Sequence, residues 1–355
     1  MLQIRNLKNI RFSQNKNVIR KLKRYLQRTR HLKQAQLVLD WVNTEGWESE
    51  IYAYTLTYGP TGDRKSETGV MRLLTGADFT EAQSEYRTLS LLHQAGYPVP
   101  EVYALGTSKD GFKHPFILMQ RVEGGDFYSR FPKSPEDDQK PLQDFIELFR
   151  RLHTLDWRPY VENPNAVSPP DQPFFHFDRK LTLFSQYIKA ANLTAFDPIL
   201  SWLNEHRATT ACDHASVVHR DFHPNNILED SQGNLFVVDW TSAEISDYRF
   251  DLAWTLALTL AYGGDIRREM VLTEYERQMG ATVPALDVFE VVAFVRRIGS
   301  AMISMQAGAE KMGMRPEAVE AMRQDRVAFE RLFIRLKALT NLDLPEIMDW
   351  VQKLG

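Results

Sequence analysis

Residues 217–228 contain side chains that could move a phosphoryl group. The run reads Val-Val-His-Arg-Asp-Phe-His-Pro-Asn-Asn-Ile-Leu, and a short apolar segment ends in Asp239, thirteen residues after Asn226. Asp221 and Asn226 are five residues apart on a tight loop, and Asp239 closes the far end of a hairpin, so the three can converge on one small volume. Asn226 and Asp239 offer the hard oxygen ligands that Mg²⁺ prefers. Asp221 can orient and deprotonate a hydroxyl for in-line attack on phosphorus.

Each of these residues also has a simpler interpretation when it is taken alone. An isolated Asp221 could cap a turn, and an isolated Asp239 could end a strand. The chemical interpretation is favoured because all the parts occur together and in the required order. His223 has two open roles, contact with the transferred phosphate or substrate and packing beside Pro224.

The elements that must position these residues fall into two regions. One region is rich in β-forming residues, with strands predicted near residues 37–41, 51–58, 68–74, 102–105 and 115–120. One helix is predicted after the third strand, from about Thr80 to Gly96, because Thr80-Glu81-Ala82-Gln83 has capping-box spacing. From Gly124 onward the pattern is helical apart from one hairpin. We therefore predict an α+β protein with a small β-rich lobe at 35–122, which contains one key helix, and a larger, mainly helical lobe at 123–355.

Residues 1–34 form a basic arm before these lobes. Residues 1–39 contain 11 Lys or Arg and no acid, although the whole chain has a net charge of only −3. Apolar residues recur every three or four positions within 18–32, which predicts a helix that packs its apolar side on the small lobe. The alternative is that residues 1–33 contact an anionic surface. We expect no specific binding of nucleic acid, and a transit peptide is disfavoured because the arm contains a single serine.

Composition excludes several other classes of protein. A single cysteine, Cys212, rules out a disulfide framework and a cysteine-based zinc site. The longest strongly apolar stretch, residues 252–262, has 11 residues, whereas a membrane span needs about 20. We therefore expect a protein of the cytoplasm with no membrane span.

The motifs resemble those of the aminoglycoside phosphotransferase and choline kinase group, within the protein-kinase-like fold. The shared pattern is His-x-Asp-x-x-x-x-Asn-x-Leu at residues 219–228, then a strand ending in Asp-Trp at 239–240, then residues 247–253. Weaker matches occur upstream in the same order, at residues 70–73, 85–87 and 98–100. The resemblance covers roughly residues 35–280, and it implies a bilobal protein-kinase-like fold.

The resemblance also implies roles for the residues of the second lobe. Asp221 would be the catalytic base or hydroxyl-orienting residue. Asn226 and Asp239 would hold Mg²⁺ across the phosphates of ATP or GTP. His219 would support the loop by hydrogen bonds, and Asp251 would anchor it from the helix below.

In the small lobe, the resemblance implies a nucleotide site. Glu85 would pair with Arg72, and Arg72 would contact the α and β phosphates. Adenine would bind the backbone of Gln120 and Val122, with Met119 behind the ring. Two features depart from the family pattern: the strand residue is arginine where lysine is more familiar, and the turn at 43–49 has one glycine instead of a glycine-rich loop.

Three functions are compatible with these motifs. The favoured one is an ATP- and Mg²⁺-dependent kinase that phosphorylates a hydroxyl of a small molecule. A protein kinase is disfavoured because only 11 residues separate Asp239 from Asp251, too few for an activation segment on which a peptide docks. A catalytically silent nucleotide-binding module would be expected to lack Asp221, Asn226 or Asp239, and all three are present.

The acceptor is the part that the motifs leave open. Residues 241–355 contain 17 acids and 14 bases, a balance that selects no class of substrate. Trp254, Tyr262 and Tyr275 are candidates for an aromatic cage around a quaternary ammonium group. Their helical spacing is more typical of a packed core than of a cage.

Overall fold

The computed structural model describes residues 16–43, 49–308 and 316–355. The chain divides into two compact units. The first unit comprises residues up to Gly125 together with Leu228–Thr241, and the second comprises Asp126–Ile227 and Ser242–Gly355. The limits predicted from the sequence, 1–34, 35–122 and 123–355, stay a prediction. In the described residues, no helix is both long enough and apolar enough to cross a membrane.

The first unit is built on a five-stranded antiparallel sheet with strand order β1-β2-β3-β5-β4. Side chains alternate between its two faces, as Tyr52, Tyr54 and Leu56 show on one face, because successive residues of a strand point in opposite directions. A bulge interrupts the pairing of β1 and β2 between Leu39 and Trp41. The strands are β1 (Gln36–Asn43), β2 (Glu50–Tyr58), β3 (Lys65–Leu73), β4 (Val102–Gly106) and β5 (Phe116–Met119).

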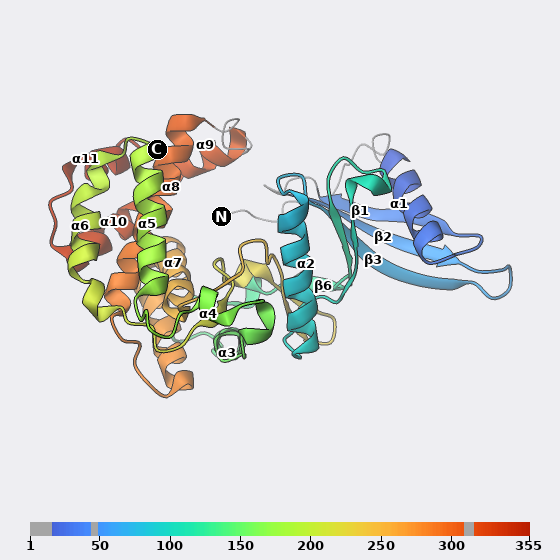
Figure 1. The fold of residues 1–355 in the computed structure, drawn as a ribbon, viewed down its shortest axis with the longest axis horizontal. Helices are drawn as coiled ribbons and strands as arrows, with labels where there is room; N and C mark the ends of the chain where they lie inside the picture. Colours follow the sequence, from blue (N-terminus) through green and yellow to red (C-terminus); the bar gives the residue numbers. More distant parts are fainter. Residues whose placement is uncertain (1–15, 44–48, 309–315) are drawn as a thin grey trace. The chain divides into compact units, whose positions relative to one another are not determined.

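Helix α1 (Lys16–Thr29) packs on this sheet, as predicted for the basic arm (Figure 1). Leu22, Tyr25 and Leu26 are buried against residues of β1, β2, β3 and β5. The helix ends at Thr29, earlier than the predicted pattern, and His31 just beyond it has a φ of 53°. Arginines at positions 20, 24 and 28 are exposed. Residues 1–15 of the arm lie outside the described residues.

Helix α2 (Phe79–Gln94) follows β3, as predicted, but its cap differs from the predicted one. Asp78 is the N-cap, because its side chain accepts from the Glu81 backbone while the Glu81 side chain accepts from the Asp78 backbone at 2.8 Å. Thr80 therefore lies inside the first turn. Asp78-x-x-Glu81 and Thr80-x-x-Gln83 both have capping-box spacing. Because they overlap in the sequence, the spacing alone does not decide which one caps the helix.

The segment Leu228–Thr241 joins the first unit although it follows a loop of the second. Its backbone supplies the reason, because Val237 N donates to Pro98 O at 2.8 Å and Ser231 N donates to Glu123 O at 3.1 Å. Short strands β6 (Gly124–Asp126), β8 (Ile227–Asp230) and β9 (Leu235–Val237) form a three-stranded sheet in the order β6-β8-β9.

The second unit is mainly helical (Figure 1). Its core includes α3 and α7. Phe149 of α3 stacks on Phe222, which lies on the loop after β7, with ring centroids 4.2 Å apart. Helix α7 is kinked at Gly264, whose φ of 79° and ψ of −177° are strained for other residues. Strands β7 (Ser216–Val218) and β10 (Glu244–Ser246) pair antiparallel. The helices are α3 (Lys140–His153), α4 (Pro164–Val167), α5 (Phe175–Ala190), α6 (Asp197–Glu205), α7 (Tyr248–Met279), α8 (Leu286–Ala307), α9 (Pro316–Gln324), α10 (Arg326–Thr340) and α11 (Pro345–Gln352).

Candidate active site

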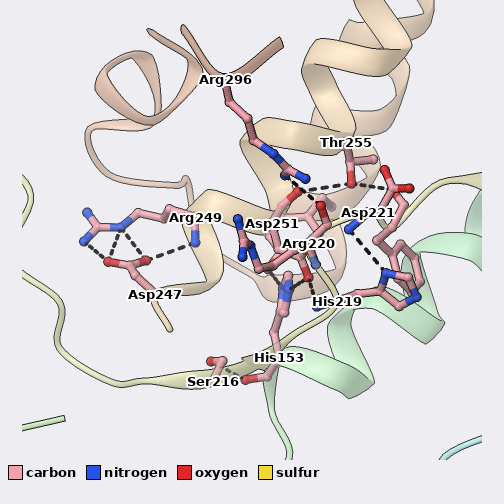
Figure 2. A network of polar contacts seen from close by, with 12 residues as sticks. His153, Ser216, His219, Arg220, Asp221, Asp247, Arg249, Asp251, Thr255 and Arg296 are labelled. Carbon is pink, nitrogen blue, oxygen red and sulfur yellow. Dashed lines mark hydrogen bonds and ion pairs between the residues drawn. The ribbon is translucent and has the colours of Figure 1, made fainter. Parts of the chain in front are cut away.

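The loop that follows β7 is held in place by one buried carboxylate of α7. Asp251 is fully buried, and its two oxygens accept hydrogen bonds of 2.7 Å from the backbone N–H groups of His219 and Arg220 (Figure 2). Arg220 has a φ of 68°, a strained value for a residue with a side chain. Two charge-assisted hydrogen bonds to adjacent N–H groups fix this turn. Asp251 therefore holds the backbone of this loop at two adjacent residues.

His153, for which the sequence predicts no role, and Tyr275, a candidate only for an aromatic cage, support Asp251 in turn. His153, at the end of α3, places its Nε2 3.4 Å from Asp251 Oδ2, and its Nδ1 lies 2.8 Å from the hydroxyl of Tyr275. The backbone carbonyl of His153 accepts from Ser216 Oγ at 2.8 Å (Figure 2). This polar network is buried, so each member satisfies groups that water cannot reach. In the sequence, the members of this network are marked only as polar residues that interrupt the apolar stripes of helices.

Asp221 lies on the anchored loop, and three groups contact it. Trp254 Nε1 donates to Asp221 Oδ1 at 2.8 Å, and His223 Nε2 lies 3.4 Å from Oδ2. His219 supports the loop as predicted, because its Nδ1 accepts from the backbone N–H of Asp221 at 3.3 Å. The contact of His223 with Asp221 is neither of the two roles left open for it by the sequence.

These contacts keep the Asp221 carboxylate ionised. Burial by itself would raise the pKa of Asp221, but the hydrogen bonds from His223 and Trp254 and the nearby imidazoles outweigh it, so the pKa lies well below its usual range. The side chain is still 40% exposed. Asp221 is therefore an accessible, negatively charged hydrogen-bond acceptor at neutral pH.

Asn226 closes the same loop. Its Nδ2 donates to the backbone carbonyl of Asp221 at 2.9 Å, an arrangement that leaves the side-chain oxygen Oδ1 for another ligand. The short 3₁₀ turn at Pro224–Asn226 holds this geometry, and Asn226 N donates to His223 O at 2.9 Å. The loop thus presents one carboxylate and one carboxamide oxygen from residues five apart.

In the first unit, Arg72 joins two of the other predicted residues. It forms an ion pair with Glu85, and its Nη2 lies 2.8 Å from Asp239 Oδ1. Its Nε also donates to Ser49 Oγ at 3.1 Å, a partner that the sequence did not indicate. The Glu85 side chain is 2% exposed and that of Asp239 is 45% exposed. The predicted pair of Arg72 and Glu85 is therefore present, and Asp239 is the accessible member of the group.

The local sequence explains why these three side chains meet. Arg72 lies between the buried residues Met71 and Leu73 at the end of β3, so its side chain points to the opposite face. Glu85 lies on the buried side of α2, in the row that contains Ala82 and Leu89. A carboxylate buried there requires a cationic partner, and the guanidinium of Arg72 supplies it.

Asp239 retains a donor oxygen that suits a metal ion. Within the described residues, Asp239 accepts hydrogen bonds from Arg72 and from Thr241 Oγ1, the latter at 3.2 Å, and both reach Oδ1. Its other oxygen, Oδ2, is therefore available for a ligand. Its φ of 69° is an uncommon backbone conformation of the kind often found at functional sites. Oδ2 of Asp239 and Oδ1 of Asn226 are hard oxygen donors, so their chemistry fits Mg²⁺. The described residues contain no cluster of three or more His, Cys, Asp or Glu side chains placed to hold a different metal.

The segment after β5 offers backbone groups of the type expected for adenine. Gln120 N donates to Glu101 O at 2.7 Å, so only the carbonyl of Gln120 remains for a ligand. Val122 N–H has no hydrogen-bond partner among the described residues. Met119 is the last residue of β5 and is partly exposed. The turn predicted to cover the phosphates, at 43–49, lies mostly outside the described residues, which omit 44–48.

The sequence and the fold agree on the class of protein. Residues 43–289 match the phosphotransferase enzyme family APH. The match spans more than half of the chain, and the protein belongs to this family. A comparison with curated protein sequences found no significant match.

Solved structures share the fold at low sequence identity. A putative aminoglycoside phosphotransferase from Ralstonia eutropha aligns with a TM-score of 0.63 and 18% identity, over 90% of this chain and 98% of that one. A choline/ethanolamine kinase family protein from Mesorhizobium loti aligns with a TM-score of 0.50 and 14% identity, over 85% and 90%. A thermostable mutant of the aminoglycoside phosphotransferase APH(4)-Ia, in ternary complex with ADP and hygromycin B, aligns with a TM-score of 0.51 and 15% identity, over 90% and 98%. The chain therefore has the kinase-like fold of these proteins.

Proposed function

We propose that this protein is a kinase that transfers the γ-phosphate of ATP to a hydroxyl group of a small molecule. The observation that carries the proposal is the Asp221 carboxylate, which is accessible, held ionised by Trp254 and His223, and fixed on a loop that Asp251 anchors. Membership of the phosphotransferase family and a structural relative solved with ADP support it.

In this mechanism Asp221 accepts a hydrogen bond from the acceptor's hydroxyl, orients its oxygen towards phosphorus and takes its proton as the new bond forms. Such a carboxylate is a weak base, so positioning is its larger contribution. Asn226 and Asp239 hold Mg²⁺ through the oxygens that their other contacts leave available. Bound Mg²⁺ supplies positive charge that offsets the negative charge of the phosphates.

The nucleotide is assigned to the first unit. Arg72, oriented by Glu85, binds the phosphate oxygens, and its planar guanidinium suits them. The carbonyl of Gln120 and the N–H of Val122 bind the edge of the base, and Met119 packs behind it. GTP would use the same phosphate contacts, so the choice of base rests on these two backbone groups.

The test begins with binding of the nucleotide. Millimolar Mg·ATP should raise the melting temperature, because a ligand that binds only the folded state stabilises it by about 2.7 kcal/mol at one hundred times its Kd. Asp239→Ala should abolish most of this shift, whereas Asp213→Ala, a change at an exposed carboxylate, should leave it intact. A folded wild-type protein without any shift would overturn the proposal. A shift without turnover of any hydroxyl compound would indicate a silent module instead.

A further inference from the structure

A small cavity in the second unit is lined by three cationic side chains. Lys180 of α5, Arg220 of the anchored loop and Arg296 of α8 border it, together with the rings of Phe184, Phe250 and Trp254. Its volume is about 20 Å³, and a single water needs roughly 10–15 Å³. No carboxylate is among the described residues that line it. The cavity therefore has room for one or two polar atoms between cationic walls.

The cavity adjoins Asp221. Trp254, which forms one wall, donates its Nε1–H to Asp221 Oδ1 at 2.8 Å. Arg220, which forms another wall, is the preceding residue of the loop. Arg296 Nη1 donates to the Arg220 carbonyl at 2.8 Å (Figure 2). The cavity and the Asp221 carboxylate thus share the Trp254 side chain and the backbone at Arg220–Asp221.

The cations around the cavity outnumber the carboxylates that form ion pairs with them. Glu244 forms an ion pair with Lys180, and its Oε1 also lies 3.3 Å from Arg220 Nε. Arg179 approaches the same Glu244 at 4.0 Å. Among the described residues Arg296 forms no ion pair, although Asp221, Asp251 and Glu244 attract it at longer range. One glutamate is shared by three cations while Arg296 has no acidic partner of its own.

The pKa values of two of these cations are lowered, mainly by burial. Burial, and then the positive charge of Arg220, lowers the pKa of Arg296 to about 10. Burial also lowers the pKa of Lys180 to about 8, although Glu244 acts in the opposite direction. A bound anion would reverse both effects, because a negative charge favours the protonated forms.

The same surroundings disfavour a quaternary ammonium group. The guanidinium of Arg296 already lies over the Trp254 ring, 3.7 Å from its centroid. Tyr275 is buried and its hydroxyl lies 2.8 Å from His153 Nδ1, while the Tyr262 hydroxyl contacts Asp325 at 2.9 Å. The three aromatic residues considered for a cage therefore do not form one.

We propose that the acceptor is a hydroxy acid whose carboxylate binds among Lys180, Arg220 and Arg296 while its hydroxyl contacts Asp221. This inference rests on the proposed kinase function. The hydroxyl oxygen forms a bond to the γ-phosphorus as the bond to the bridging oxygen of ADP breaks. The hydroxyl proton passes to the Asp221 carboxylate and then to solvent, and the products are a phosphate ester and ADP.

The first test measures binding with 3-hydroxybutyrate and a series of longer hydroxy acids, in saturation-transfer NMR and in assays of ADP release. The comparison compounds are 3-hydroxybutyramide, choline and glycerol 3-phosphate. Hydroxy acids should bind at least about tenfold more tightly than the amide, since charge-assisted hydrogen bonds are stronger than neutral ones. Preference for choline, for the phosphate or for the amide would overturn the inference.

The second test uses variants. Arg296→Met and Lys180→Met should each weaken binding of the acid about 10- to 100-fold, with little change for the amide. Lys189→Met, an exposed position on the same helix as Lys180, should bind the acid like the wild type. The Mg·ATP melting shift should be unchanged in all three variants. If the shift is present and the acid binds equally well to all variants, the inference is wrong while the kinase function stands.

Discussion

At the scale of single residues, the site depends on how neighbours control two charges. The hydrogen bonds at Asp221 outweigh its burial and lower its pKa, whereas burial of Lys180 outweighs the attraction of Glu244 and lowers its pKa to about 8. Asp221 follows Arg220 directly in the sequence. Lys180 is linked to Arg220 through Glu244, whose carboxylate contacts both cations. Hydrogen bonds keep Asp221 charged, whereas burial brings Lys180 close to its titration point at neutral pH.

Replacement of Asp221 should separate turnover from nucleotide binding. Asp221→Asn keeps the size of the side chain but removes the charge, and we expect turnover to fall about 10²- to 10⁴-fold. The Mg·ATP melting shift should remain, because Asp221 is not assigned to the metal. Steady-state ADP release and thermal melting measure the two effects. Loss of the shift with retained turnover would show that the roles of Asp221 and Asp239 are reversed.

The lowered pKa of Lys180 predicts a pH-dependent stability. The folded protein releases this proton near pH 8 and the unfolded chain near its usual 10.5, so the unfolded state holds more protons between those values. Stability must then rise with pH across that window. The free energy of unfolding of the wild type should increase relative to that of Lys180→Met from pH 8 to 10.5, as measured by denaturant titration. If the difference in free energy of unfolding between wild type and Lys180→Met stays constant across this pH range, or changes in favour of the variant, the assigned environment of Lys180 is contradicted.

At the scale of elements, helix α7 carries most of the loop's support. Asp251 and Thr255 lie one turn apart on it, and Thr255 Oγ1 donates to Phe222 O at 2.7 Å. Trp254, from the same turn, holds Asp221. Helix α7 therefore contacts the backbone of the loop at His219, Arg220 and Phe222, and its Trp254 contacts the side chain of Asp221.

Asp251→Asn tests this support. A carboxamide has one acceptor oxygen, so one of the N–H groups of His219 and Arg220 would face an NH₂ group. An unsatisfied buried donor costs about 1–3 kcal/mol, and we expect a loss of stability of that size in denaturant unfolding. Asp265→Asn, at an exposed position of the same helix, should change little. Equal stability of the two variants would mean that Asp251 does not hold the loop.

The sequence predicts the elements and the short-range part of the site well. The strands, the helix after β3 and the helical second region follow from periodicity, and Asp221 and Asn226 follow from their spacing. The contacts of His153 with Asp251 and of Trp254 with Asp221 join residues 98 and 33 positions apart. Local patterns carry no information about such pairs because they depend on how α3 and α7 pack. The cap of α2 differs because two overlapping motifs compete within residues 78–83.

At the scale of the whole molecule, charge is unevenly distributed. The basic residues of the N-terminal arm precede a chain that is otherwise acidic, since residues 40–355 contain 32 bases and 46 acids. The apolar side of α1 is buried on the first unit through Leu22, Tyr25 and Leu26. Two of its neighbouring cations form ion pairs within that unit, Arg28 with Asp110 and Arg30 with Glu67.

Deletion of residues 1–33 should therefore lower thermal stability. Full burial of a large apolar side chain contributes about 1.5–3 kcal/mol, and three such residues of α1 are buried. Arg20→Ala and Arg24→Ala, at exposed positions, should leave the melting temperature unchanged. The full chain should show little binding to anionic vesicles at physiological salt, measured by cosedimentation. Unchanged stability of the truncated chain, with salt-sensitive vesicle binding of the intact one, would indicate a surface tether.

The order in which the chain enters its two units has a consequence for synthesis on the ribosome. The first unit is interrupted after Gly125 and receives Leu228–Thr241 only later. Translation at about 5–20 residues per second takes about 6–23 s to cover the 116 residues from Gly125 to Thr241. During that interval the first unit lacks β9 and Asp239, so the ion pair of Arg72 with Asp239 cannot form. Candidate nucleotide-binding residues thus come together late in translation, after the loop that carries Asp221 has been synthesised.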